Sequence, residues 1–345
     1  MTKVKGNKKR VWRVIILVVL SLILIITTST ALFYHSKLKL IRYDNGVSAQ
    51  QGSIDENDAD VLAEQQRMAE AVAPLEPRES VAATGDIFKN EDYLNILLLG
   101  TDERTPYFND NARGDTCMLL TLGKKDGAVK LVSFERGMGV PILEGQYQGQ
   151  YDWLTHAFRY GGADLMMKEV QECFKVDVNH YFRVNLNTFE QGIETIGGID
   201  INLTPAEAEY VNFYTQRECY VAGQNHLDGR AAITYARCRK IDSDWRRIER
   251  QRNVIQAALS KTKHLSVAEM NELLNDILPL IQTNLTEWEI TNLLIYVPQY
   301  QGAVIEQMTI PVRGSYGSMT GMGGRSLFSV DFETNAKILR DFIYD

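Results

Sequence analysis

Cysteine is sparse in this chain of 345 residues, and no two cysteines have the spacing of a CxxC motif. The four that occur are Cys117, Cys173, Cys219 and Cys238. This scarcity excludes a disulfide-framework scaffold, a zinc knuckle and a thioredoxin-like redox motif. A single bridge between Cys219 and Cys238 stays open.

An excess of positive charge is also missing. The chain has 37 Lys and Arg against 44 Asp and Glu, a net charge of −7, and six of the basic residues lie within the first 34. A general nucleic-acid binder needs a basic surface to neutralise phosphates. We therefore expect no nucleic-acid partner, and any anion site must be a local cluster of arginines.

Several catalytic signatures are absent. There is no GxSxG elbow, so Ser-His-Asp hydrolysis has no support. The Gly-rich segment Gly314–Arg325 lacks the Lys-Ser/Thr pair of a phosphate loop, so we predict a mobile loop there. His156 fits either a substrate contact or the commoner structural role.

One apolar stretch near the N-terminus is long enough to cross a bilayer. Val14–Tyr34 has no charged residue and would span roughly 31 Å as a helix. The lysines and arginines before it predict a cytoplasmic tail (1–13), a transmembrane helix (14–34) and a cell-membrane protein whose remainder is extracellular. The alternative is a cleaved signal peptide, since small residues occupy Thr27–Ala31.

The chain after this stretch divides by composition. From Asp44 to about Phe88 the chain turns acidic and its side chains become small, which predicts little buried apolar area. We therefore expect residues 35–88 to be an extracellular stalk, with a helix between Asp55 and Ala73. Residues 89–345 form the expected extracytoplasmic catalytic domain. Because the whole chain is 45% apolar, a domain of this length can build a substantial core.

Short apolar runs bounded by turn residues predict buried strands in this domain. The runs are Tyr93–Gly100, Cys117–Leu122, Ala128–Phe134, Tyr181–Val184, Ile199–Leu203 and Val304–Ile310. Helical patterns occupy Ala163–Phe174, Leu186–Ile196, Thr204–Tyr214, Gly229–Tyr235, Asp244–Lys263, Val267–Ile281, Thr286–Tyr296 and Glu333–Ile343. This mixture predicts an α/β fold, with a central sheet flanked by helices on both faces.

Charged residues gather where the first two strands meet. Asp102 follows the first strand, Arg113 and Asp115 precede the second, and Arg136 ends the third. If the first two strands pair, Asp102 and Asp115 lie at one edge of the sheet, where open α/β sheets commonly bind ligands. Two carboxylates there could hold Mg2+ through oxygen ligands. The alternative is a solvated loop.

A second cluster lies in the segment ITYARCRKIDSDWRRIERQR. Arg237 and Arg239 are two residues apart, so in an extended segment both face one side. Ser243 or Asp242 can cap the following helix, on which Asp244, Arg247 and Gln251 share a face. Three guanidiniums and an amide near a helix N-terminus suit a pyrophosphate. The alternative, a solvated helix face, fits Arg246, Arg250 and Arg252 better.

Seven segments, in this order, resemble the motifs of the LytR-CpsA-Psr family of Gram-positive cell-wall proteins. They are NILLLGTDER, RGDT, SFERG, THAFRYGG, GGID, LDGRAAITYARCRK and DSDWRRIERQR, and together they cover about residues 93 to 260. One departure stands out, because the family usually has SIPRD where this chain has SFERG.

The resemblance implies a membrane-anchored phosphotransferase with Mg2+ as its cofactor. Such an enzyme moves an anionic glycopolymer, teichoic acid or capsular polysaccharide, from a polyprenyl-pyrophosphate carrier to peptidoglycan. The family fold implies a mixed sheet that encloses an apolar lipid tunnel. By the same resemblance Asp102 and Asp115 hold the metal, and the pyrophosphate contacts are Arg113, Arg136, Arg237, Arg239, Arg247 and Gln251.

Two other functions stay open. The protein could be a polyprenyl-pyrophosphate phosphatase that uses water as its acceptor, or a non-catalytic regulator that only binds the lipid carrier. The catalytic reading assigns the reaction to Asp102, Arg113, Asp115 and Arg136. The sequence identifies neither the polymer nor a general base.

Overall fold

The computed structural model describes residues 32–44, 59–103, 108, 112–238, 241–262, 265–294, 296–300 and 303–345. The predicted transmembrane segment lies outside these ranges except for its last three residues. Within the described ranges, no helix has both the length and the apolar character that crossing a membrane requires.

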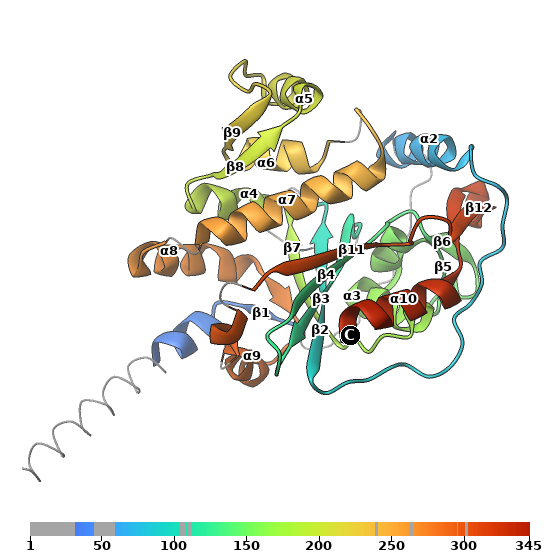
Figure 1. Cartoon of the computed structure of the whole chain (residues 1–345), viewed down its shortest axis with the longest axis horizontal. Coiled ribbons are helices and arrows are strands. Elements are labelled where there is room, and N and C mark those ends of the chain that lie inside the picture. Colours follow the sequence, from blue (N-terminus) through green and yellow to red (C-terminus); the bar gives the residue numbers. More distant parts are fainter. Residues whose placement is uncertain are drawn as a thin grey trace, which may run out of the picture.

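Five of the six predicted apolar runs lie in one mixed sheet, which confirms the α/β fold (Figure 1). The sixth, Ile199–Leu203, forms a strand of a separate two-stranded sheet. Among the described residues the mixed sheet has seven strands, in the order β1 Arg42–Tyr43, β10 Gln282–Thr283, β7 His180–Asn185, β2 Tyr93–Thr101, β3 Thr116–Gly123, β4 Val129–Phe134 and β11 Ile305–Ile310. β3 runs antiparallel to both β2 and β4, whereas β2 is parallel to β7 and β4 is parallel to β11.

Helices cover both faces of this sheet, as predicted (Figure 1). α3 and α10 lie on one side, and α4, α7 and α8 lie on the other. The bounds are α2 Ala59–Val72, α3 Leu154–Phe174, α4 Leu186–Thr195, α5 Pro205–Thr215, α6 Gly229–Ala236, α7 Asp244–Thr262, α8 Val267–Ile277, α9 Glu287–Leu294 and α10 Phe332–Tyr344. Smaller sheets pair β5 Gly139–Pro141 with β6 Tyr151–Trp153, β8 Ile199–Leu203 with β9 Gly223–Leu227, and β12 Tyr316–Thr320 with β13 Ser326–Val330.

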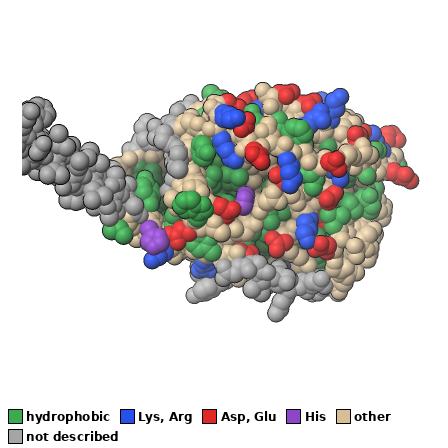
Figure 2. All heavy atoms as spheres, turned by 90° about the horizontal axis from the view of Figure 1, so that it is seen from below, with side chains coloured by type: hydrophobic (Ala, Val, Ile, Leu, Met, Phe, Trp, Pro, Cys, Tyr) green, Lys and Arg blue, Asp and Glu red, His purple; other side chains and the backbone are tan. Residues whose placement is uncertain are grey.

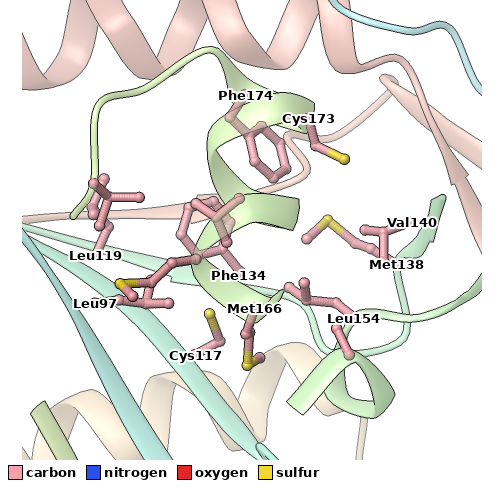
Figure 3. Close-up of a cluster of buried hydrophobic side chains, with 14 of the residues drawn as sticks. Leu97, Cys117, Leu119, Phe134, Met138, Val140, Leu154, Met166, Cys173 and Phe174 are labelled. Atoms are coloured by element: carbon pink, nitrogen blue, oxygen red, sulfur yellow. The ribbon is translucent and has the colours of Figure 1, made fainter. Parts of the chain in front are cut away.

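The main core lies between the sheet and α3. Alternate residues of a strand face opposite sides, so Leu97 and Leu119 point toward α3, where Phe134, Met166 and Phe174 complete the cluster (Figure 3). All five side chains are buried. This core holds β2, β3 and β4 in fixed positions, which in turn fixes the side chains that follow their ends.

α3 begins nine residues earlier than its periodic pattern predicts. The pattern is interrupted by two glycines, and Gly162 has φ +65°, a conformation that glycine adopts without steric cost. The helix bends there and continues, so the segment THAFRYGG belongs to it. The four cysteines are free, and a Cys219–Cys238 bridge is not formed.

The segment assigned to a stalk departs from the sequence-based expectation. α2, inside the predicted helical range, buries Val61, Met68 and Val72, and Met68 packs with Trp153 and Phe328 of the domain. The signal is the spacing of these apolar residues at i, i+7 and i+11, which places them on one helix face. Composition alone hides it, because small and acidic residues fill the other faces.

The segment Gly314–Arg325 is not the predicted loop. It contains β12 and the start of a hairpin with β13, and the Arg325 side chain is buried. Arg325 donates to the buried carboxylate of Asp152 at 3.1 Å, and His156 bonds to the same group. Burial opposes ionisation of Asp152, but the charges and hydrogen bonds of His156, Arg325 and Tyr160 lower its pKa. His156 therefore has the structural role.

Acidic and basic side chains alternate over the face of the molecule shown in Figure 2, with hydrophobic side chains between them. Neither sign forms a continuous patch on this face. On this face, selective attraction of an anion would therefore depend on a local arrangement of side chains.

Candidate functional site

Asp102 and Asp115 lie at the same edge of the central sheet. β2 and β3 are antiparallel, with Gly100 opposite Thr116, so the chain leaves one strand where it enters the other. The carboxylate of Asp102 accepts the backbone N–H of Arg113 at 2.8 Å and its Nε–H at 2.9 Å. Strand pairing therefore brings Asp102 and Asp115 to one edge of the sheet, as predicted. Arg113 is held in place by Asp102, the acid whose charge it neutralises.

Arg136 connects this edge to α2. Its guanidinium is almost completely buried and donates to the carboxylate of Asp115 at 3.1 Å. It also forms an ion pair with Glu64 of α2. Glu64 is a residue of the site that sequence reasoning missed. Next to Arg136, Glu135 accepts the backbone N–H of Gly137 at 3.1 Å, so the variant SFERG segment makes its own turn.

The second arginine cluster is only partly as predicted. Arg237 is not in an extended segment: it caps the C-terminus of α6 with helical dihedral angles. Arg239 and the side chain of Asp244 lie outside the described residues. Arg247 and Gln251 follow each other by one turn on α7 and face the same cavity as Arg237.

Two arginines assigned to a solvated helix face point inward instead. Arg250 is buried and donates to Glu207 at 2.6 Å and to the carbonyl of Cys238 at 3.0 Å. Arg252 donates to Thr309 at 2.6 Å. Arg246 alone of the three remains exposed, paired with Glu249 one turn along. Helical periodicity could not reveal this, because α7 has partners on more than one side.

A cavity of about 290 Å³ lies between the sheet and α4, α6 and α7. Its walls are mainly apolar side chains of β2, β3 and β7 and of the three helices. Polar groups of Asp115, Arg237, Arg247 and Gln251 enter the same cavity. The apolar lining comprises Leu98, Leu99, Met118, Phe182, Val184, Leu186, Phe189, Ile233, Ala236 and Ile255.

The local sequence explains how strand residues reach this cavity. Leu98 pairs in register with Phe182 of β7, and both face away from the main core. β7 ends at Asn185, whose side chain caps α4 by accepting the N–H of Thr188 at 2.9 Å. Asn185 also lines the cavity. An Asn between an alternating strand and a helix is a typical helix N-cap, and this pattern could have identified Asn185 from the sequence.

The carboxylates of Asp102 and Asp115 are suited to Mg2+ by their chemistry. Both supply oxygen ligands, and about a fifth of each side chain is exposed. In the described part of the chain, no three His, Cys, Asp or Glu side chains converge on one point. Mg2+ commonly takes one or two carboxylates and completes its shell with water and substrate phosphate, so two acids fit such an ion.

The fold and the site together define an α/β protein in which an apolar cavity meets a cluster of arginines and acids. The chain belongs to the LytR_cpsA_psr family, which it matches over residues 57–340. This confirms the resemblance seen in the sequence motifs and extends it to include α2.

Named relatives and a solved structure agree with this family. The chain is 33% identical over 207 residues to the polyisoprenyl-teichoic acid–peptidoglycan teichoic acid transferase TagU of Bacillus mycoides, covering 59% of this chain and 64% of the relative. It is 33% identical over 245 residues to the TagU of Oceanobacillus iheyensis, covering 68% and 72%. The match therefore spans just under two thirds of the first relative's length.

The fold is similar to that of the LytR-CPS2A-psr family protein YwtF (TagT), solved with bound octaprenyl pyrophosphate lipid. The TM-score is 0.55 at 23% identity, and the alignment covers 78% of this chain and 98% of that one. At this identity the similarity supports the fold.

Proposed function

We propose that this protein is a phosphotransferase that moves an anionic glycopolymer from a polyprenyl-pyrophosphate carrier to peptidoglycan. The observation that carries the proposal is the cavity lined by β2, β7, α4 and α7. One ligand that needs both an apolar channel and a cluster of guanidiniums is a lipid pyrophosphate. The names of the two TagU relatives support this choice.

In this proposal the polyprenyl chain occupies the apolar part of the cavity, which serves as the lipid tunnel expected from the family. The pyrophosphate lies beside Arg237, Arg247 and Gln251, where bidentate guanidinium contacts suit phosphate oxygens. Burial strengthens these contacts, because Arg247 is almost completely removed from water. The octaprenyl pyrophosphate in the structure of YwtF supports a lipid of this class.

The reaction then exchanges one phosphate ester bond for another. A peptidoglycan hydroxyl attacks the phosphorus that carries the polymer, the bridging P–O bond breaks, and polyprenyl phosphate leaves while the hydroxyl proton is released. In this proposal Arg113 and Arg136 offset the charge on the transferring phosphoryl group. Asp102 and Asp115 would hold Mg2+, which neutralises phosphate charge when bound.

The proposed location follows from the substrates. A polyprenyl carrier stays in the membrane and peptidoglycan lies outside it, so an anchor at 14–34 with an extracellular domain suits both. In this arrangement the N-terminal tail is cytoplasmic.

A transfer assay with a matched pair of variants tests the proposal. Full-length protein in detergent receives a lipid-pyrophosphate-linked teichoic acid and peptidoglycan. We expect Arg237→Ala to reduce transfer by about 10²- to 10³-fold, the usual cost of losing a group that stabilises transition-state charge. Arg246→Ala, which removes another exposed arginine of the same segment, should leave transfer within about twofold.

The acceptor decides between transferase and hydrolase. Polymer coupled to peptidoglycan supports the proposal. Release of polyprenyl phosphate without coupling would instead identify a phosphatase. Tight binding of the lipid without turnover of either kind would identify a carrier-binding protein, and equal activity of Arg237→Ala and wild type would refute the site.

A further inference from the structure

A second cavity, of about 380 Å³, lies next to the first on the other side of Arg136. Its walls come from α2, from the start of α7 and from the β12–β13 hairpin. Arg136 lines this second cavity and bonds to Asp115, which lines the first. The Arg136–Asp115 ion pair therefore joins the walls of the two cavities, and nothing in the proposed donor site uses the second.

An aromatic surface forms one wall of the second cavity. The rings of Trp245 and Tyr316 lie 5.5 Å apart at an angle of 30°, and Phe328 packs edge-on against Tyr316 at 5.6 Å. Phe328 is buried, whereas Trp245 and Tyr316 are only half-buried. The backbone N–H of Phe328 donates to the carbonyl of Gly137 at 3.1 Å, so the aromatic wall is fixed relative to Arg136.

Charged side chains of both signs face this aromatic wall. Arg67 and Glu70 of α2 line the cavity, and so does Glu64, which pairs with Arg67 and Arg136. Asp242 and Ser243 contribute from the segment before α7. The acidic side chains of this cavity would repel a polyanion. Its several charged groups would also disfavour a lipid chain, because an apolar ligand would remove their water without replacing its hydrogen bonds.

We propose that this second cavity binds the glycan acceptor, with a pyranose ring of the peptidoglycan strand packed on Trp245 and Tyr316. A pyranose has C–H groups on its faces and hydroxyls around its edge. The faces suit an aromatic surface, and the edge suits carboxylates and guanidiniums that accept and donate hydrogen bonds. This inference rests on the proposed transferase function, because it assigns the second substrate of that reaction.

The position of the cavity places the acceptor beside the charged end of the proposed donor site, because Arg136 of the second cavity bonds to Asp115 of the first. A sugar on Trp245 lies on the far side of the Arg136–Asp115 pair from the donor cavity. Its hydroxyl can then reach the pyrophosphate without crossing the apolar part that the lipid occupies. α2 forms one side of this acceptor site, which gives the segment expected to be a stalk a role in substrate binding.

Calorimetric binding with a defined glycan tests the inference. The probe is a tetrasaccharide of alternating N-acetylglucosamine and N-acetylmuramic acid without stem peptides, titrated into full-length protein in detergent. We expect Trp245→Ala to weaken its Kd by at least tenfold, and Trp245→Phe, which keeps an aromatic surface, by clearly less. Trp288→Ala is the matched control, since Trp288 is a highly exposed tryptophan on α9, which lines neither cavity.

Tyr316→Ala provides a second variant in case Trp245→Ala fails to fold. Each variant is also titrated with octaprenyl pyrophosphate, whose Kd should stay within about twofold. Glycan affinity unchanged in both Trp245→Ala and Tyr316→Ala, equal losses in Trp288→Ala, or no binding by the wild type at millimolar glycan would overturn the inference. Absence of lipid binding and transfer, with glycan affinity still dependent on Trp245, would refute the proposed function instead.

Discussion

The substitution Glu64→Gln tests two roles of Glu64 separately: its contribution to stability through the ion pair with Arg136, and the effect of its negative charge on lipid binding. Glu64 pairs with Arg136 and Arg67, and only 4% of the side chain of Glu64 or of Arg136 is exposed. Removing one member of a buried ion pair typically costs about 3–5 kcal/mol. Because Asp115 still accepts a hydrogen bond from Arg136 at 3.1 Å, we expect the lower end, about 3 kcal/mol.

A loss of this size lowers Tm by about 6–12 °C in a domain of this class, which differential scanning fluorimetry resolves easily. Glu70→Gln is the control, since Glu70 is exposed on the same helix and its loss should change stability by less than about 0.5 kcal/mol. The same charge removal makes the surroundings of Arg136 more positive, so octaprenyl pyrophosphate should bind Glu64→Gln at least as tightly as wild type.

Two results would refute this reasoning. A Tm for Glu64→Gln equal to that of Glu70→Gln would mean that the pair contributes nothing to the fold. Weaker lipid binding by a folded Glu64→Gln protein would mean that Glu64 supports the phosphate site instead of neutralising it.

Further predictions concern the core, pH, the cavity and the metal. Leu119→Ala should destabilise the fold by about 2–5 kcal/mol, measured by urea unfolding, because Leu119 of β3 is fully buried in the core between the sheet and α3. Burial raises the pKa of Glu169 to about 8. The folded state therefore binds more protons than the unfolded state between about pH 4.5 and 8, stability falls as pH rises through that window, and Glu169→Gln should flatten the pH dependence of Tm. Ile255→Trp, which fills the apolar cavity, should weaken binding of octaprenyl pyrophosphate at least tenfold while leaving inorganic pyrophosphate binding unchanged. EDTA should abolish transfer and added Mg2+ restore it; full transfer after exhaustive chelation would remove Asp102 and Asp115 from a metal role.

The sheet and its helices were predictable because their sequence patterns are strong. Short continuous apolar runs bounded by turn residues, such as 93–100 and 117–122, are typical of strands buried on both faces. The turn residues that bound them limited the errors to one or two positions. Two helices are exceptions. α3 starts earlier than predicted, since Gly161 and Gly162 interrupt its periodicity but only bend the helix. α8 ends at Ile277, four residues before the predicted end.

The site was predictable only where sequence neighbours become spatial neighbours. Antiparallel pairing of two adjacent runs brings Asp102 and Asp115 to one edge, and helical spacing places Arg247 beside Gln251. The pairing of Glu64 with Arg136 joins residues that are 72 positions apart, and that contact depends on how α2 docks. Arg250 likewise became a buried residue because Glu207 and Asp242 lie opposite it, which helical periodicity cannot indicate.

The proposed function requires that the cavity between the sheet and α7 bind a polyprenyl pyrophosphate. Photocrosslinking of full-length protein tests this occupancy, with an octaprenyl pyrophosphate analogue whose tail carries a benzophenone, followed by peptide mapping. We predict labels on the peptides that contain Phe182, Phe189 and Ile255, all lost on competition with unlabelled octaprenyl pyrophosphate. Labels confined to other peptides, or labels that persist under competition, would contradict the claim.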